Sequence, residues 1–201
     1  MSTLLAQPRI ARLTVEQVHA MIKAGIVHEG APIELIDGVL IHKDRSASGE
    51  DLTSISKAHS LVVSLLGELG AELAQRGCHM QTQNPLSLPP YDEPEPDGVI
   101  LRGRPRAYTN RVPGAADAGS VIEVADSSLA YDRKTKLGLY ARAGIAQYVI
   151  VNLSGRCIEM YEQPSPDGSY QNIAVRHAGE TVALRLADDE RFEILADRIL
   201  P

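Results

Sequence analysis

Two acidic residues lie within apolar segments of this chain, and a lysine follows them. Asp97 comes directly after Pro96 and opens an apolar run, and Glu123 lies inside the run Val-Ile-Glu-Val-Ala at 121–125. An ionised carboxylate is costly to bury unless a cation compensates it. A hard divalent cation and a lysine are the natural compensators, so the segment that ends at Lys136 is the strongest candidate for a functional site.

A divalent metal would explain the two acids together. If the strands that carry Asp97 and Glu123 are neighbours, both carboxylates converge at one edge of the core. Two carboxylates with a backbone carbonyl, waters and a substrate phosphate are a usual coordination set for Mg²⁺. We therefore expect Asp97 and Glu123 to bind the metal, with the Val124 carbonyl as a further ligand. Such a metal activates a water and stabilises the charge that develops on a phosphodiester oxygen.

Lys136 is the third candidate. It lies on a predicted helix, on the same face as Asp132 and Tyr140. A lysine there can hold the attacking water or neutralise a phosphate. The alternative is a weak surface ion pair with Asp132, four residues earlier, and for Lys136 taken alone that alternative is favoured.

Supporting roles are open for several other polar residues. Glu34 opens a predicted hairpin, where it is either a direct or supporting metal ligand or, as favoured for it alone, an acid in solvent. His59 lies beside the apolar stripe of a long helix, and it either packs at the core boundary or orients a carboxylate of the site. Gln81 and Gln83 either line the cleft or face water. The arginines of one loop either contact phosphates or, for most of them, are solvated: Arg102, Arg104, Arg106 and Arg111.

A strand, helix, strand unit must position these groups. The segments 120–125 and 146–152 are nearly continuous apolar runs, which is typical of buried central strands. A helix from about Asp132 to Ala143 connects them, so the crossover should be right-handed.

The preceding half of the core supplies the first acid. An amphipathic helix is predicted from about Thr53 to Arg76, and a strand is predicted over 79–88. A proline-rich connector over 89–96 then leads into an apolar strand that begins at Asp97. A long loop over 103–119 follows it.

The flanking segments read as additions to this core. Thr14 and Gln17 form a predicted capping box at the start of a short helix, and Asp37-Gly38 is a predicted type I′ turn of a hairpin. We predict one α/β domain over 1–201, with a central mixed sheet flanked by helices. Its parts are a core at about 53–152, an N-terminal helix and hairpin over 13–42, and C-terminal β-hairpins over 156–200 that extend or flank the sheet.

Composition narrows the class of protein. The 201 residues are 44% hydrophobic and carry a net charge of −6, which predicts a globular domain without a broadly basic nucleic-acid surface. A small local basic groove remains compatible with this charge. Cys78 and Cys157 match no metal or redox spacing and are expected to be reduced thiols. No apolar run has transmembrane length and no signal peptide is recognisable, so we expect a cytoplasmic protein with no membrane partner.

The ordered motifs resemble the Uma-two family of the restriction endonuclease-like, PD-(D/E)XK superfamily. They are Glu-Leu-Ile-Asp-Gly-Val-Leu at 34–40, His59, Pro-Asp-Gly-Val at 96–99, the segment 121–128, and the segment 131–145 running into 147–151. The similarity extends from about Leu13 to Leu195. The resemblance implies a restriction endonuclease-like core. It also implies metal ligation by Asp97 and Glu123, Lys136 as the motif lysine, and support from Glu34 and His59.

The resemblance also implies an activity, with one departure from the superfamily pattern. That pattern places a lysine two positions after the second acid, where this chain has Ala125, and Lys136 of the following helix takes its place. The implied function is a Mg²⁺- or Mn²⁺-dependent endonuclease that acts on DNA. The alternative is a catalytically inactive nucleic-acid-binding or regulatory module, because a fold does not guarantee activity; a hydrolase for another phosphorylated substrate is a weaker third. A homodimer would cover the sheet edges of the C-terminal hairpins and pair two cutting sites.

Overall fold

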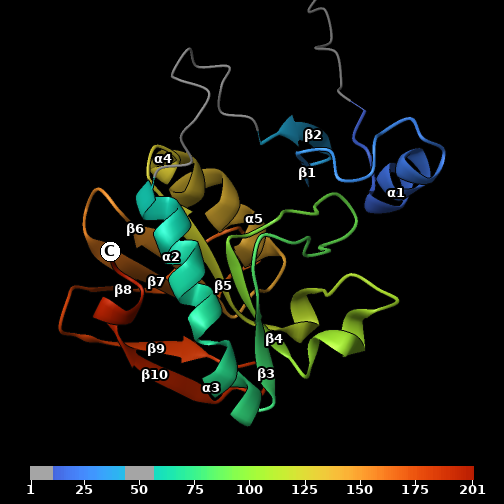
Figure 1. The fold of residues 1–201 in the computed structure, drawn as a ribbon. Helices are drawn as coiled ribbons and strands as arrows, with labels where there is room; N and C mark the ends of the chain where they lie inside the picture. Colours follow the sequence, from blue (N-terminus) through green and yellow to red (C-terminus); the bar gives the residue numbers. More distant parts are fainter. Residues whose placement is uncertain (1–10, 44–56) are drawn as a thin grey trace, which may run out of the picture.

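The computed structural model describes residues 11–43 and 57–201 of the chain. Its centre is a mixed sheet in the spatial order β3-β4-β5-β6-β7-β8, flanked by helices (Figure 1). β5 and β6 run parallel, and the other neighbouring pairs are antiparallel. The strands are β3 (Cys78–Gln81), β4 (Gly98–Arg102), β5 (Ala118–Ala125), β6 (Gln147–Asn152), β7 (Cys157–Pro164) and β8 (Tyr170–Arg176). This arrangement confirms the predicted fold class.

β5 and β6 are the buried central strands that their apolar runs predict. Every residue of both strands is buried. They are connected by a helical segment that consists of α4 (Leu129–Tyr131), a π-helical turn (Asp132–Lys136) and α5 (Leu137–Arg142). The single helix predicted over 132–143 therefore begins earlier and contains a π-turn. We keep the name π-turn for these five residues, because they carry Lys136.

The sheet separates two hydrophobic clusters. One lies under α2 (Lys57–Glu68) and α3 (Gly70–Gln75) and includes Ile122 and Val124; the other lies under α5 and includes Val121 and Ala125. Successive residues of a strand point to opposite faces of the sheet. Glu123 therefore shares the face of Val121 and Ala125 and points toward α5. The alternation of side chains along β5 therefore places this carboxylate on the side of the sheet that α5 covers.

Two predicted elements have different bounds in the structure. The helix expected over 53–76 is divided at Leu69 into α2 and α3, and its first four residues lie outside the described part of the chain. Gly67 and Gly70 flank the division, and glycine lowers helix propensity. The strand expected over 79–88 ends at Gln81. Beyond it, repeated prolines lack the N–H that a strand ladder needs, and 82–97 form only isolated bridges.

The N-terminal helix and hairpin form as predicted. Thr14 caps α1 (Val15–Lys23) in a capping box with Gln17. β1 (Ile33–Ile36) and β2 (Val39–His42) pair around Asp37-Gly38, and both turn residues have positive φ, as a type I′ turn requires. The hairpin bonds to the connector before β4, since Leu35 and Glu93 exchange backbone hydrogen bonds of 3.3 and 2.7 Å. This contact brings β1 to the start of β4.

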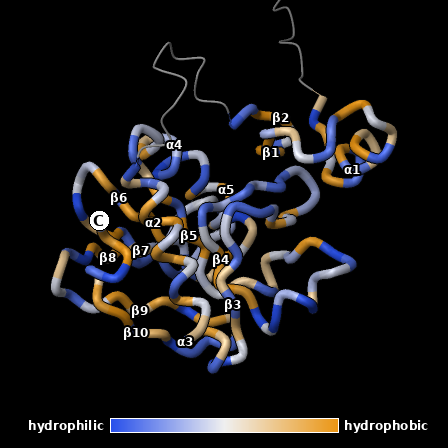
Figure 2. The backbone as a smooth tube through the Cα atoms, viewed as in Figure 1, coloured by the Kyte–Doolittle hydropathy of each residue, from blue (hydrophilic) through white to orange (hydrophobic). Residues whose placement is uncertain are grey.

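The C-terminal strands both extend and flank the central sheet. β7 and β8 extend it, while β9 (Thr181–Arg185) and β10 (Arg191–Leu195) form a separate pair. Residues of β9 and β10 close the hydrophobic cluster under α2 and α3. Figure 2 shows the hydrophobic residues gathered in the strands, with mostly hydrophilic loops around them. Within residues 11–43 and 57–201, every helix is too short or too polar to span a bilayer.

We expect the core under α2 to be sensitive to cavities. Leu66 is fully buried, whereas Leu61 on the same helix is 47% exposed. Leu66→Ala should lower the free energy of unfolding by about 2–5 kcal/mol, because it removes buried methyl groups and leaves a cavity. Leu61→Ala should change it by less than about 0.5 kcal/mol. Urea denaturation of both variants tests this, and equal losses would contradict the assignment of the buried face.

Candidate active site

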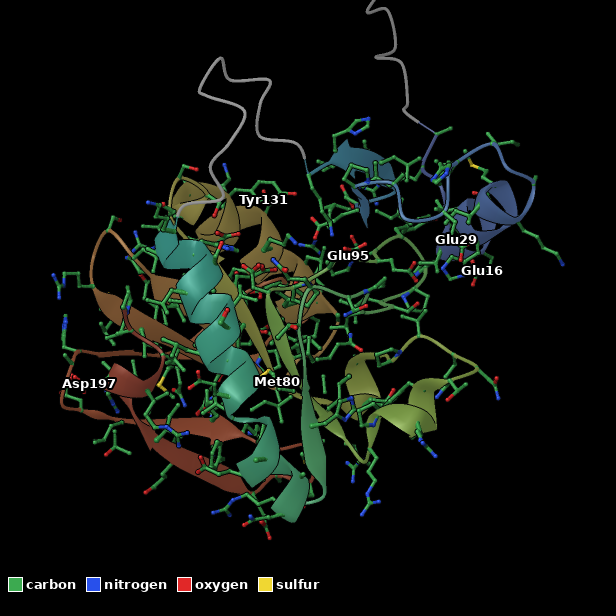
Figure 3. The ribbon with its side chains drawn as sticks, viewed as in Figure 1. Glu16, Glu29, Met80, Glu95, Tyr131 and Asp197 are labelled. Atoms are coloured by element: carbon green, nitrogen blue, oxygen red, sulfur yellow. The ribbon has the colours of Figure 1, made fainter. Side chains whose placement is uncertain are left out.

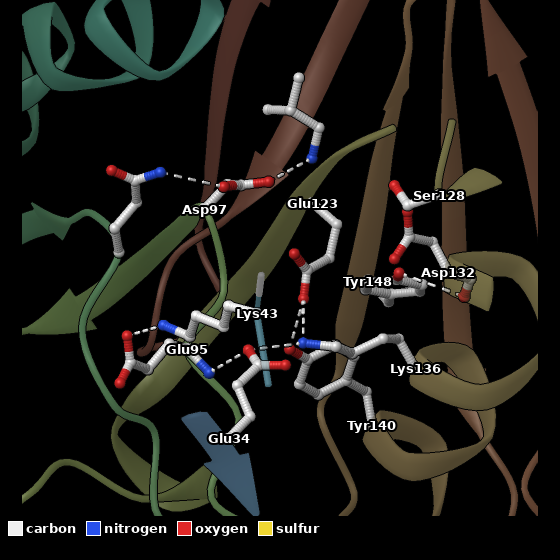
Figure 4. Close-up of polar contacts among 12 residues, drawn as sticks. Glu34, Lys43, Glu95, Asp97, Glu123, Ser128, Asp132, Lys136, Tyr140 and Tyr148 are labelled. Atoms are coloured by element: carbon white, nitrogen blue, oxygen red, sulfur yellow. Dashed lines mark hydrogen bonds and ion pairs between the residues drawn. The ribbon is translucent and has the colours of Figure 1, made fainter. Parts of the chain in front are cut away.

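Five side chains that the sequence singles out lie together in the structure. Glu34 comes from β1, His59 from α2, Asp97 from the residue before β4, Glu123 from β5 and Lys136 from the π-turn. Hydrogen bonds and ion pairs connect them in two groups. One group lies around Lys136 (Figure 4), and the other joins His59 to Asp97. Elements from both sides of the sheet and from the N-terminal hairpin therefore meet at this point.

Lys136 is buried between two carboxylates. Its Nζ lies 2.9 Å from Glu34 Oε1 and 3.2 Å from Glu123 Oε1, and the residue is 4% exposed. It therefore does not form the surface ion pair with Asp132 that its spacing alone would favour. Glu34 is likewise largely buried rather than a strand-end acid in solvent, and its Oε1 also accepts the backbone N–H of Glu95 at 2.7 Å.

The π-turn directs Lys136 into the site. Its backbone widens at Asp132, whose carbonyl accepts the N–H of Leu137 five residues on. The Tyr148 hydroxyl donates to the same carbonyl at 3.3 Å, and Ser128 Oγ donates to Asp132 Oδ2 at 2.6 Å. Single π-turns inside helices are frequent at functional sites. Here the turn takes Lys136 off the regular helical face and toward Glu123.

A second anchor fixes the same turn to the sheet. Arg133 donates to both carboxylate oxygens of Glu159 on β7, at 2.9 and 2.7 Å. Glu159 is itself buried and also accepts from Asn152 and from the Tyr161 hydroxyl. Bidentate arginine–carboxylate pairs fix direction as well as distance. The π-turn is thus held at both of its first two residues.

Burial decides the direction of the pKa shift of Glu123, whereas the neighbouring carboxylates decide that of Lys136. Burial raises the pKa of Glu123 to about 8; nearby Lys136 opposes this rise, while Asp97 adds to it. The Tyr140 hydroxyl donates to Glu123 Oε1 at 2.7 Å. Burial alone would lower the pKa of Lys136, but the carboxylates of Glu123 and Glu34 together raise that pKa above its ordinary value. Lys136 is therefore a cation at neutral pH.

Asp97 is held by donors on one of its oxygens. Its Oδ2 accepts the backbone N–H of Val124 at 2.9 Å and lies 3.1 Å from His59 Nε2, while Gln83 donates weakly to Oδ1 at 3.5 Å. Burial would raise the pKa of Asp97, but the hydrogen bonds from His59 and Val124 lower it below its usual value. Asp97 is accordingly ionised at neutral pH. Val124 contributes its N–H here, and the role of its carbonyl as a metal ligand stays a prediction.

Gly98 allows α2 to approach β4 beside this carboxylate. A Cβ atom on Gly98 would meet Leu66 Cδ1 at 3.0 Å and Met80 Sδ at 3.3 Å. The Leu66 side chain on α2 would then have to shift by a few tenths of an ångström to make room. The Pro-Asp-Gly order therefore has a packing reason as well as a chemical one.

Two charged residues of the site were not predicted from the sequence. Lys43, directly after β2, forms an ion pair with Glu95, which lies on the connector near the N-terminal hairpin (Figures 3 and 4). Burial lowers the pKa of Lys43, against the opposing effect of Glu34. The only sequence signal for Glu95 is its place two residues before Asp97. No sequence signal points to Lys43, because it simply follows the second strand of the predicted hairpin.

The loop arginines, which the sequence leaves as either phosphate contacts or solvated side chains, lie at or beyond the other end of β4. Asp97 precedes the strand, whereas Arg102 is its last residue. The Arg102 guanidinium donates to the Ala187 carbonyl, and Arg111 pairs with Asp117 at 2.6 and 2.8 Å. These two arginines are engaged away from the acidic cluster.

The charges and donor atoms of the cluster fit a divalent cation. Four carboxylates (Glu34, Glu95, Asp97, Glu123) face two ammonium groups (Lys43, Lys136), which leaves two negative charges when all are ionised. The Glu123 oxygen that is not bonded to Lys136 points toward Asp97 in Figure 4. Among the described residues, no three acidic, histidine or cysteine side chains form a metal cage. Mg²⁺ commonly binds through one or two carboxylates and keeps its waters, so a carboxylate pair is sufficient.

Comparison with known proteins places this geometry in context. A family model described as "Uma2: Putative restriction endonuclease" matches residues 15–194. The fold is similar to a solved structure from Anabaena variabilis ATCC 29413, described as a putative nuclease belonging to DUF820. The TM-score is 0.66 with 13% identity, over 93% of this chain and 97% of that one. Identity this low supports the shared fold alone. A search of curated proteins found no match.

Removing the buried ammonium group of Lys136 should lower the free energy of unfolding. Lys136→Met leaves Glu34 and Glu123 without their cation, and breaking a buried ion pair in this way costs about 3–5 kcal/mol. Lys134→Met, in the same π-turn but exposed, is the matched control and should change the free energy of unfolding by less than about 0.5 kcal/mol. Urea denaturation of both variants makes the comparison. A small and equal loss in the two would show that the lysine does not hold the cluster together.

The raised pKa of Glu123 predicts a pH-dependent stability. Its pKa rises from 4.5 to about 8 on folding, so between these values the folded state holds more protons than the unfolded state. The contribution of Glu123 to the free energy of unfolding therefore falls as pH increases across this window. In the presence of a metal chelator, the free energy of unfolding of the wild type, minus that of Glu123→Gln, should decline as pH increases over the same window. Parallel pH profiles would contradict the assignment.

Proposed function

The chain belongs to the Uma2 family of putative restriction endonucleases, and from this membership we propose that it is a metal-dependent endonuclease that hydrolyses phosphodiester bonds of DNA. The observation that carries the proposal is the buried cluster itself. Asp97 and Glu123 lie in one cluster with Lys136, and the cluster carries an excess of two negative charges when all its groups are ionised, which one Mg²⁺ or Mn²⁺ would neutralise. The membership alone supports a nuclease; the metal and the residue roles are our proposal.

Asp97 and Glu123 are the proposed metal ligands, and Val124 could add its carbonyl. A metal bound there would supply Lewis-acid activation of a water and of the scissile phosphate. His59 and the Val124 N–H hold one oxygen of Asp97, and the other accepts only the weak hydrogen bond from Gln83. Tyr140 and Lys136 hold one oxygen of Glu123 in the same way. Each ligand would thus be fixed in direction by hydrogen bonds before any metal binds.

Lys136 and Glu34 act on the geometry of the site in this proposal. Lys136 offsets part of the effect of burial on Glu123, because its positive charge lowers the pKa that burial raises. Glu34 holds the lysine from the opposite side and is fixed by the Glu95 N–H. Preorganised charges of this kind need no rearrangement when the reaction begins.

Cutting both strands of a duplex would call for two such sites, and a homodimer is the assembly we propose for it. The outer strands of the central sheet are β3 and β8, so a second copy could pair at either. β3 pairs with β4 next to Asp97, whereas β6 and β7 separate β8 from β5. Assembly through β8 would therefore leave the cluster open to substrate.

The proposal predicts metal-dependent cutting that depends on both acids. Purified protein with Mg²⁺ or Mn²⁺ should nick plasmid or single-stranded DNA. Asp97→Asn and Glu123→Gln should each lower the rate by about 100-fold or more, because a metal supplies several kcal/mol of transition-state stabilisation. Glu193→Gln, an exposed acid on β10, is the control and should cut at the wild-type rate.

Two results would contradict this function. One is the absence of cutting by the wild type under either metal, and the other is wild-type cutting by Asp97→Asn. Calorimetric titration with Mn²⁺ supplies a second readout, in which the binding signal should be lost in Asp97→Asn. A protein that binds DNA but neither binds metal nor cuts would be the inactive binding module instead.

A further inference from the structure

The motif lysine is poorly placed to meet an anion. Lys136 is 4% exposed, and its ammonium group already lies within 3.2 Å of two carboxylates. A DNA phosphate would have to displace Glu34 or Glu123 to reach it, and would leave that carboxylate buried without its cation. Such an exchange is costly. Apart from the proposed metal, contact with an anionic backbone at this cluster therefore calls for a cationic side chain other than Lys136.

Lys43 meets that need by its position. Its side chain is 31% exposed, and among the described residues its ion-pair partner is a single carboxylate, Glu95. Its charge interacts with those of Glu34, Glu123 and Asp97, so it stands beside the cluster rather than on a remote surface. The backbone N–H of Lys43 donates to the Pro32 carbonyl at 2.8 Å, which fixes the start of the side chain at the end of the hairpin.

We propose that Lys43 is the residue that contacts a backbone phosphate of the DNA substrate, by exchanging its ion pair with Glu95 for one with a phosphate oxygen. The inference rests on the proposed nuclease function and adds a substrate-binding residue from outside the central sheet. The released Glu95 carboxylate is 23% exposed and can be hydrated, while its backbone N–H stays bonded to Glu34. The exchange therefore leaves the buried cluster intact.

The exchange makes Glu95 a competitor of the substrate. A carboxylate and a phosphate oxygen are alternative partners for one ammonium group, and both make charge-assisted hydrogen bonds. Removing the charge of Glu95 should free Lys43 for DNA, whereas removing the charge of Lys43 should weaken DNA binding. A purely structural ion pair would behave differently, because loss of either partner would then harm the site in the same direction.

The test is the salt dependence of DNA binding. Fluorescence anisotropy with a labelled duplex, in Ca²⁺ to slow hydrolysis, gives the slope of log K against log salt concentration. Lys43→Met should weaken binding several-fold and reduce that slope by about one, as expected for one lost phosphate contact. Lys43→Arg should keep the slope, and Glu95→Gln should tighten binding. Lys23→Met, an exposed lysine on α1, is the control and should match the wild type.

Three outcomes would overturn the role of Lys43. They are an unchanged slope in Lys43→Met, weaker binding in Glu95→Gln, and an absence of DNA binding by the wild type. Urea denaturation of each variant shows whether it is folded, and Lys43→Arg and Glu95→Gln decide the matter if Lys43→Met is not. The nuclease function is judged separately, by cutting with Mg²⁺ or Mn²⁺, so a failure of one proposal is distinguishable from a failure of the other.

Discussion

The buried ammonium group of Lys136 is the constraint on which this structure depends. It lies between Glu34 and Glu123, which are far apart in the sequence and belong to the N-terminal hairpin and the central sheet. Burying three charges is tolerable only when each has its partners in place. The hairpin, the central strand β5 and the crossover helix must therefore all reach one position. The ion pairs join an added N-terminal element to the core through the site itself.

The rest of the crossover serves this arrangement. A regular α-helix would leave Lys136 on the face that its spacing with Asp132 indicates, whereas the π-turn directs it into the cluster. Such a turn needs outside support, and Tyr148 and the Arg133–Glu159 pair supply it from β6 and β7. The neighbouring strands β6 and β7 thus do more than fill the core, since they carry the hydroxyl group of Tyr148 and the carboxylate of Glu159 that fix the π-turn.

Sequence reasoning recovers what depends on local pattern. The apolar runs of β5 and β6, the capping box at Thr14 and the Asp37-Gly38 turn follow from burial, capping and φ preferences, and each forms as predicted. The division of the long helix at Leu69 and the early end of β3 differ from the prediction, although the flanking glycines and the repeated prolines that favour them are present in the sequence. The π-turn and the place of Lys43 depend on contacts between distant segments, which no local pattern encodes.

The different roles proposed for Lys136 and Lys43 follow from the difference in their burial. A lysine enclosed by carboxylates can orient them and hold their charge, but it cannot also leave them for a phosphate. A lysine at the rim, paired with one hydrated carboxylate, can exchange partners at little cost. The net charge of −6 opposes the approach of DNA, so a local cation at the rim favours it. On this argument the central sheet supplies the chemistry of the proposed nuclease, and the appended hairpin supplies its first contact with the substrate.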